Sequence, residues 1–220
     1  MPSSELEHAY VAFNENPLSS HQRMVRLVGA DRRVLDAGCS SGYLTERLVR
    51  NGCTVVGLEY DAEAAAVAGR WCEQMLVGDI ETMDLPLEEE SFDVVLCGDL
   101  IEHLRNPQAA MARLRPFLRP GGRLVLSTPN VANWSVRLML LFGRFRYTER
   151  GLLDRTHTHL FTRKTLREAV EAAGYDVLRI EPVIPVPGPE VPPVSRLADA
   201  IGRRLPGFFA YQFVVEAQRR

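Results

Sequence analysis

The chain has 220 residues, of which 46% are hydrophobic, and this is typical of one sizeable globular domain. Its 26 basic and 28 acidic residues give a formal net charge of −2, so we expect no nucleic-acid partner. The longest apolar run, near 138–142, is far too short to span a membrane. Cysteines without paired spacing indicate buried reduced thiols and a cytoplasmic protein.

Helices and strands are predicted to alternate along most of the chain. The N-terminal segment 1–30 is expected to be partly helical, with Ser19 and Ser20 capping a helix that Gly29 ends. Further helices are predicted over 6–13, 43–50, 61–72, 107–118, 164–173 and 196–204. Apolar runs predict strands at 33–36, 54–58, 74–77, 92–97, 123–127, 176–181 and 208–217. This alternation indicates an α/β fold with a mostly parallel sheet and right-handed crossovers.

The turn after the first predicted strand is the most informative stretch. It reads Asp36-x-Gly38-x-x-x-Gly42 and joins a strand to a helix, as in nucleotide-binding units. Dinucleotide-binding turns bring a pyrophosphate to a helix N-terminus, whereas Asp36 would repel phosphate. A ligand carrying an ammonium and a sulfonium group suits this turn better. After the second strand, Glu59 can accept both hydroxyls of a ribose.

Polar residues also follow the third and fourth predicted strands. Asp79 and Ile80 come after the third strand, and Asp99, Glu102 and His103 come after the fourth. Because the carboxyl ends of parallel strands meet at one edge of a sheet, we expect these residues to lie together. Asp79 can accept the amino group of an adenine, and the Ile80 N–H can meet a ring nitrogen. The set predicts a nucleoside site.

Three motifs resemble those of class I S-adenosylmethionine (SAM) methyltransferases. The D-x-G-x-x-x-G turn resembles their first motif, with Ser40 where many members have a second glycine. Residues 97–104, CGDLIEHL, resemble the fourth-strand signature of the ubiquinone-type O-methyltransferases. Residues 118–130, LRPGGRLVLSTPN, resemble the start of the fifth strand in these enzymes. The resemblance extends over roughly 33–181.

This resemblance implies a Rossmann-like seven-stranded sheet with the order 3-2-1-4-5-7-6 and an antiparallel strand 7. Helices are then expected on both faces, within a single domain over 1–220. The resemblance also implies SAM as the cofactor and S-adenosylhomocysteine as its product. The residues expected to bind the cofactor are Asp36, Gly38, Cys39, Ser40, Gly42, Glu59, Asp79, Ile80 and Gly98.

An insert at 131–160 is expected to cap the acceptor pocket. It combines a wide apolar face with alternating basic and aromatic residues at 144–147. Residues 152–162, LLDRTHTHLFT, resemble a bacterial subgroup associated with glycan and secondary-metabolite pathways. His157 falls on the histidine of that subgroup, whereas His159 does not. We interpret Asp154 and Arg155 as a structural ion pair.

His103 and His157 are the expected catalytic residues. A methyl sulfonium is already activated, so the protein mainly aligns the acceptor with it. A hydroxyl acceptor also needs a general base, for which histidine has a suitable pKa. Asp99 or Glu102 is expected to orient His103. The leading prediction is therefore SAM-dependent O-methylation of a small molecule, such as a sugar, a phenol or a secondary metabolite.

Two alternative functions are kept. Asp99-x-x-Glu102-His103 resembles the metal-binding motif of some ubiquinone-type and small-RNA 2′-O-methyltransferases. A metal-assisted RNA 2′-O-methyltransferase is therefore the first alternative, although we expect no metal. The second is a non-catalytic protein that binds SAM or a protein partner.

Overall fold

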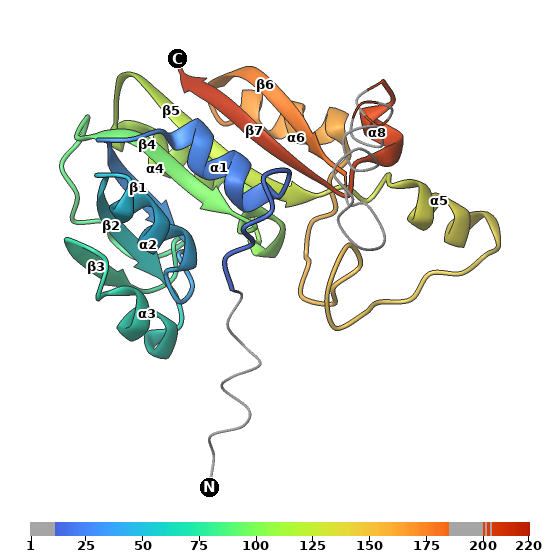
Figure 1. Cartoon of the computed structure of the whole chain (residues 1–220), viewed down its shortest axis with the longest axis horizontal. Helices are drawn as coiled ribbons and strands as arrows, with labels where there is room; N and C mark the ends of the chain where they lie inside the picture. The colour runs from blue at the N-terminus through green and yellow to red at the C-terminus, as the bar shows by residue number, and fades with distance from the viewer. Residues whose placement is uncertain (1–11, 185–199, 201, 203) are drawn as a thin grey trace, which may run out of the picture.

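The computed structural model describes residues 12–184, 200, 202 and 204–220. In these residues one sheet has the strand order β3-β2-β1-β4-β5-β7-β6 (Figure 1). The strands are β1 (Arg33–Ala37), β2 (Thr54–Glu59), β3 (Gln74–Val77), β4 (Phe92–Gly98), β5 (Leu118–Pro129), β6 (Tyr175–Val183) and β7 (Gln212–Arg219). β7 is antiparallel to both β5 and β6, and the other pairings are parallel. The predicted α/β class, strand order and antiparallel last strand are confirmed.

Helices cover both faces of this sheet. α1 and α2 pack on one face, and α4 and α6 pack on the other (Figure 1). The α-helices are α1 (Ser20–Val28), α2 (Tyr43–Arg50), α3 (Ala62–Ala68), α4 (Pro107–Leu114), α5 (Trp134–Leu141), α6 (Arg163–Ala172) and α8 (Pro206–Phe209). The short 3₁₀ helices are η2 (Ile101–His103) and η3 (Arg115–Phe117).

The centre of the sheet explains why β4 is continuously apolar. Val94 and Leu96 belong to the hydrophobic cluster that α1 and α2 cover. Val95 and Cys97 belong to the cluster beneath α4 and α6. A strand that is covered on both faces buries every side chain, so it shows no polar alternation. This central position places the residues after β4 at the middle of the sheet's carboxyl edge.

Several predicted boundaries differ from those of the structure. The helix expected over 61–72 ends at Ala68, and the helix expected over 107–118 ends at Leu114, where η3 begins. The prediction of one strand over 208–217 is wrong at its start, because α8 forms there. Pro206 favours that helix, since proline fits the first helical turn. The predictions over 6–13 and 196–204 lie largely outside the described residues.

The described part of the chain contains no helix that combines the length and apolar character needed to cross a bilayer. The cysteines are unpaired: Cys39, Cys53 and Cys97 are buried, and Cys72 is partly buried. Their burial agrees with the predicted reduced thiols.

Candidate functional site

The carboxyl ends of β1 to β4 enclose a cavity of about 500 Å³, a size typical of small-molecule sites. Among the residues expected to bind the cofactor, Gly38, Glu59, Asp79 and Ile80 line this cavity. Other lining residues are Leu58, Tyr60, Gly78, Glu81, Asp99, Leu100, His103, Leu104 and Arg105. The remaining expected residues, Asp36, Cys39, Ser40, Gly42 and Gly98, do not line the cavity.

Glu59 connects the turn after β1 to the end of β2. Its Oε2 accepts the Ser40 N–H at 2.7 Å, and its Oε1 accepts the N–H groups of Tyr60 and Asp61 at 2.8 and 2.9 Å. A carboxylate has about four acceptor sites, and these three bonds leave about one of them for a ribose hydroxyl. The backbone bonds hold the carboxylate in place before any ligand arrives.

The turn after β1 needs its glycines because it has left-handed backbone angles and lies close to α3. Gly38, Ser40 and Gly42 have φ values of 71°, 49° and 82°, in the left-handed region. A Cβ on Gly42 would lie 2.9 Å from the Ala68 Cα, so any larger residue would push the turn away from α3. Cys39 is buried against Gly57, and burial raises the pKa of its thiol. Its side chain therefore belongs to the core.

Asp36 lies behind the turn, at the end of β1, and is 1% exposed. Its Oδ2 accepts the Thr45 hydroxyl at 2.6 Å. Burial raises the pKa of Asp36 to about 6, an effect that Thr45 opposes and the nearby Glu59 charge increases. A cation in the cavity would therefore favour the ionised carboxylate.

Asp79 already has partners at the cavity rim. Its Oδ1 accepts the Glu81 N–H at 2.8 Å, and its Oδ2 lies 3.0 Å from the Arg105 Nη2. The neighbouring Ile80 is buried. Gly98 ends β4 behind the cavity, where a Cβ would lie 2.9 Å from the Leu44 Cδ1. Gly98 thus serves helix packing.

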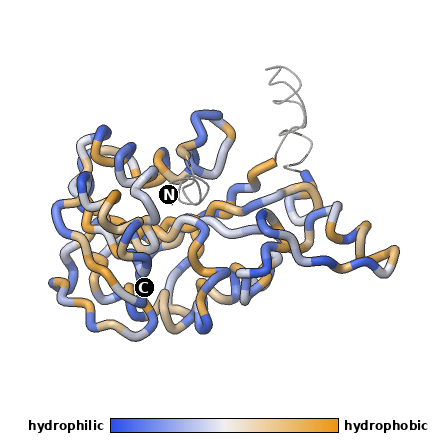
Figure 2. Tube along the Cα trace, turned by 90° about the horizontal axis from the view of Figure 1, so that it is seen from below, coloured by the Kyte–Doolittle hydropathy of each residue, from blue (hydrophilic) through white to orange (hydrophobic). Residues whose placement is uncertain are grey.

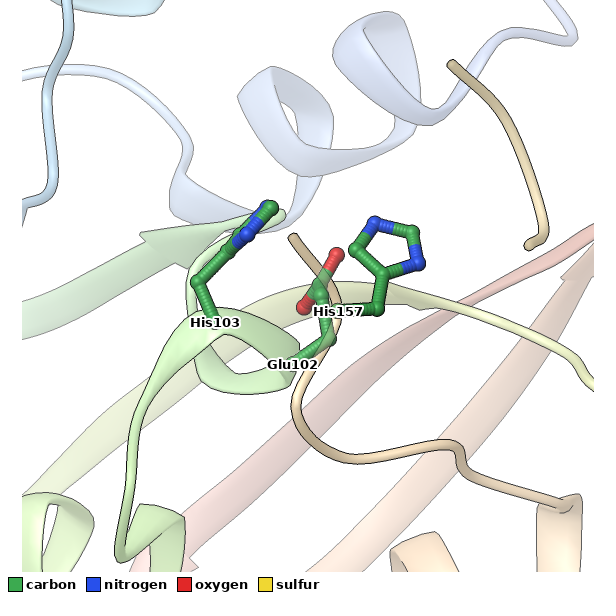
Figure 3. Close-up of side chains that lie close together, drawn as sticks. All are labelled: Glu102, His103 and His157. Atoms are coloured by element: carbon green, nitrogen blue, oxygen red, sulfur yellow. The ribbon is translucent and has the colours of Figure 1, made fainter. Parts of the chain in front are cut away.

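The expected catalytic histidines lie next to each other. His103 comes from η2, whereas His157 comes from the segment that returns after α5 (Figure 3). Their ring centroids are 4.9 Å apart in an edge-to-face arrangement. Burial lowers the pKa of His157, and the His103 charge lowers it further. His157 is therefore held as a neutral imidazole near neutral pH.

Backbone hydrogen bonds hold the return segment against η2. The N–H groups of Thr158 and His159 donate to the Glu102 carbonyl at 2.8 and 3.0 Å. The Thr158 hydroxyl donates to the Leu104 carbonyl at 2.7 Å. These bonds place His157 beside His103. They follow no sequence periodicity, so they could not be predicted.

Thr156 fixes the tautomer of His103. The Thr156 carbonyl oxygen lies 3.3 Å from the His103 Nδ1, and a carbonyl can only accept, so Nδ1 carries the proton. The Thr156 Oγ1 is 3.2 Å from the same nitrogen and donates its own proton to Asp154 at 2.7 Å. The neutral ring therefore presents Nε2 as a proton acceptor.

The expectation that Asp99 or Glu102 orients His103 is wrong in this structure. The Asp99 carboxylate instead accepts from the Ser127 hydroxyl at 2.6 Å and from the Gln212 amide at 3.2 Å. Asp99 is also in the left-handed region at φ 47°, a strained geometry often found at functional sites. An Asp154–Arg155 ion pair is not present either, since Arg155 pairs with Glu149 at 2.5 Å.

Glu102 is 1% exposed, and its Oε2 accepts the Thr128 hydroxyl at 3.0 Å. Within the described residues, Glu102 Oε1 and His157 Nδ1 are buried without a hydrogen-bond partner. Burial, together with the Asp99 charge, raises the pKa of Glu102 well above its usual value. One ligand atom from each of Glu102, His103 and His157 lies within 4.8 Å of the others. These groups could hold a divalent cation.

Sequence reasoning missed two aromatic neighbours of the site. The Tyr43 and His21 ring centroids are 4.9 Å apart. Burial raises the pKa of Tyr43, and the charges of Asp99, Asp36 and Glu102 raise it further. Tyr43 therefore adds a neutral hydroxyl beside three carboxyl groups. His159, in contrast, binds the Arg105 carbonyl at 3.0 Å and stacks on Phe161.

The sheet order and the cavity at the carboxyl ends of β1 to β4 define a Rossmann-like class I methyltransferase fold. Solved structures show the same fold at low sequence identity. A SAM-dependent methyltransferase of Thermotoga maritima has a TM-score of 0.68 at 18% identity and covers 98% of this chain and 95% of its own. Another, from Mesorhizobium loti, has a TM-score of 0.63 at 18% identity, with coverages of 91% and 96%.

The family model described as a methyltransferase domain matches residues 12–180, and the chain belongs to this family of SAM-dependent enzymes. Its cofactor is SAM. The chain is similar to the ubiquinone biosynthesis O-methyltransferase of Aeromonas salmonicida, with 31% identity over 65% of this chain and 62% of that protein. The protein of the same name from Acinetobacter baylyi is 33% identical over 61% and 58%. The chain thus spans about three fifths of the length of these relatives.

Proposed function

We propose that the protein transfers a methyl group from SAM to a hydroxyl oxygen of a small molecule. The observation that carries this proposal is the histidine pair, in which His103 lines the cavity with its Nδ1 bound to Thr156 and His157 lies beside it. A neutral imidazole acceptor is the group that a hydroxyl substrate needs. The names of the similar O-methyltransferases support an oxygen acceptor.

The residues around the cavity fit SAM. Glu59 would accept a ribose hydroxyl, and Asp79 with the Ile80 N–H would meet the adenine. The buried Asp36 favours a cationic ligand over a phosphate, since its ionised form gains from a nearby positive charge. These assignments use Asp36, Glu59, Asp79 and Ile80 of the expected cofactor set, and Gly38 would keep the turn close to the ligand.

SAM supplies a methyl group on a positively charged sulfur. S-adenosylhomocysteine is therefore a good leaving group, and the methyl group needs no further activation. The chain has to align the acceptor oxygen and to take its proton. We assign the proton to His103 Nε2, because Thr156 holds the other nitrogen as a donor. His157 would orient the acceptor. No residue of the insert at 131–160, which the structure describes in full, lines the cavity, and the apolar side chains of α5 are exposed, so the expected cap over the whole insert is not formed here. Only the return segment with Thr156 and His157, which contacts His103, would border the acceptor side.

The test is a turnover assay of the full chain with SAM and a panel of phenols, catechols and sugars, read as S-adenosylhomocysteine formed. His103→Ala should lower the rate by about 10²–10⁴, the usual contribution of a general base. SAM affinity should stay within a few-fold of the wild-type value. His159→Ala is the matched control, since that ring binds the Arg105 carbonyl and does not itself line the cavity. SAM binding without any turnover would favour the non-catalytic alternative.

A second candidate is metal-assisted methylation, including that of an RNA 2′-hydroxyl. The observation in its favour is the cluster of Glu102, His103 and His157 with its two orphaned polar atoms. In this mechanism a cation would lower the pKa of the acceptor hydroxyl. We expect turnover to survive a chelator. Loss of activity with EDTA and rescue by Mg²⁺, Mn²⁺ or Zn²⁺ would establish the metal-assisted mechanism, and RNA oligonucleotides would then join the panel.

A further inference from the structure

Exposed apolar side chains gather on one projection of the molecule. We call residues 134–155 the arm; it comprises α5 and the residues after it. The arm extends from the sheet beyond the end of β5 (Figure 1), with hydrophobic and hydrophilic stretches along it (Figure 2). Its exposed apolar residues, each between 42% and 77% accessible, are Trp134, Leu138, Leu140, Leu141, Phe142, Phe145 and Tyr147. Contiguous patches of this kind mark interaction sites.

α5 has more apolar surface than the described residues cover. An ordinary surface helix hides an apolar stripe and exposes a polar one. In α5, Val136 packs with Leu152 and Leu153, but Leu138 and Leu140 do not belong to this cluster and are about half exposed. A helix that is apolar around most of its circumference needs an apolar environment on its outer side.

The charge of the arm is opposite to that of the whole chain. It contains five arginines against two carboxylates, a local charge of +3 in a chain of −2. The arginines are Arg137, Arg144, Arg146, Arg150 and Arg155. Glu149, one of the carboxylates, pairs with Arg155. Arg144 and Arg146 are exposed and alternate with the exposed rings of Phe145 and Tyr147.

We propose that the arm docks the protein on an anionic lipid bilayer. Leucines and aromatic rings would enter the headgroup boundary, where Trp and Tyr are favoured, while the arginines meet lipid phosphates. A second copy of this chain is a poorer partner for the arm, because a two-fold contact would bring the same arginines close to each other and their charges would repel. Nucleic acid would use the arginines but leave the leucines in water. This docking is independent of the acceptor proposed above.

The first experiment sediments the full chain with vesicles of phosphatidylcholine, with or without phosphatidylglycerol. We expect binding to the anionic vesicles and its weakening by salt. In a Trp71→Phe background, Trp134 is the only tryptophan. Its emission should shift to the blue when anionic vesicles are added.

Matched variants distinguish docking through the arm from nonspecific adsorption of the protein to vesicles. Arg144→Gln/Arg146→Gln should weaken binding to anionic vesicles by about tenfold to thirtyfold. The control Arg32→Gln/Arg70→Gln removes two exposed charges elsewhere and should leave binding unchanged. Leu141→Glu/Phe142→Glu should lower binding by at least about tenfold. Circular dichroism and SAM binding would show that every variant is folded.

Three results would overturn the proposal. The first is that the wild-type chain does not bind anionic vesicles and instead forms a concentration-dependent dimer through the arm. The second is binding of an RNA oligonucleotide, but not of vesicles, through the arm arginines. The third is equal vesicle binding by the arm variants and their control.

Discussion

At the scale of single residues, the buried carboxylate of Asp36 lowers the free energy of unfolding of the ligand-free protein. Burial raises the pKa of Asp36 from its ordinary 3.8 to about 6, so the folded state holds more protons than the unfolded state between these values. Stability therefore falls as pH rises through that window, and the penalty is complete above about pH 6. The shift corresponds to about 2–3 kcal/mol. The buried charge is retained for a cationic ligand.

Asp36→Asn should therefore stabilise the ligand-free protein. We expect the free energy of unfolding at about pH 8 to rise by about 1–3 kcal/mol, because no buried charge remains. Near pH 4 the two proteins should differ little. Urea denaturation at both values measures this. The same variant should bind SAM more weakly by calorimetry, and unchanged affinity would argue against the electrostatic role of Asp36.

Thr156 gives a second prediction at this scale. Thr156→Val removes the hydroxyl between Asp154 and His103 while keeping the side-chain shape and the backbone carbonyl. The proton on Nδ1 is then less firmly fixed, so kcat should fall by about tenfold, with the KM for SAM nearly constant. Thr156→Ser should restore most of the rate. A loss of SAM affinity in parallel with kcat would indicate a structural role instead.

At the scale of elements, the hydrogen bonds between the return segment and η2 decide whether the histidines meet. The Thr158 side chain donates to backbone carbonyls at both ends of this connection. Thr158→Val should remove the hydroxyl donor of the Leu104 carbonyl, while the Glu102 carbonyl keeps its two N–H donors, and should cost about 1–3 kcal/mol locally. Hydrogen exchange should rise in 152–160 and remain unchanged in β1 to β4. Faster exchange throughout the sheet would contradict this local effect.

At the scale of the whole molecule, the cavity is built from the ends of four strands, so a ligand there should stabilise the domain as a unit. SAM at about 100 times its Kd should add about 2.7 kcal/mol to the free energy of unfolding. For a chain of this length that is a rise in Tm of about 5–10 °C. S-adenosylhomocysteine should act similarly. A thermal shift with NAD, and none with SAM, would contradict the cofactor assignment.

The sequence by itself determined the fold class, and it supplied the hypothesis for the chemistry at the carboxyl edge of the sheet. Strand and helix periods are local, and so are the turn after β1 and the acids that follow β2 and β3. These signals singled out Glu59, Asp79 and Ile80, which line the cavity in the structure. They also predicted the two histidines as separate candidates.

Only the tertiary structure decided how those candidates work. Burial under α2 raises the pKa of Asp36, and burial depends on packing from distant segments. The contact between His103 and His157 depends on backbone bonds from the return segment to η2, which any residue types could make. Thr156, rather than a neighbouring carboxylate, orients His103 because the chain folds back at that point. Such non-local bonds leave no period in the sequence.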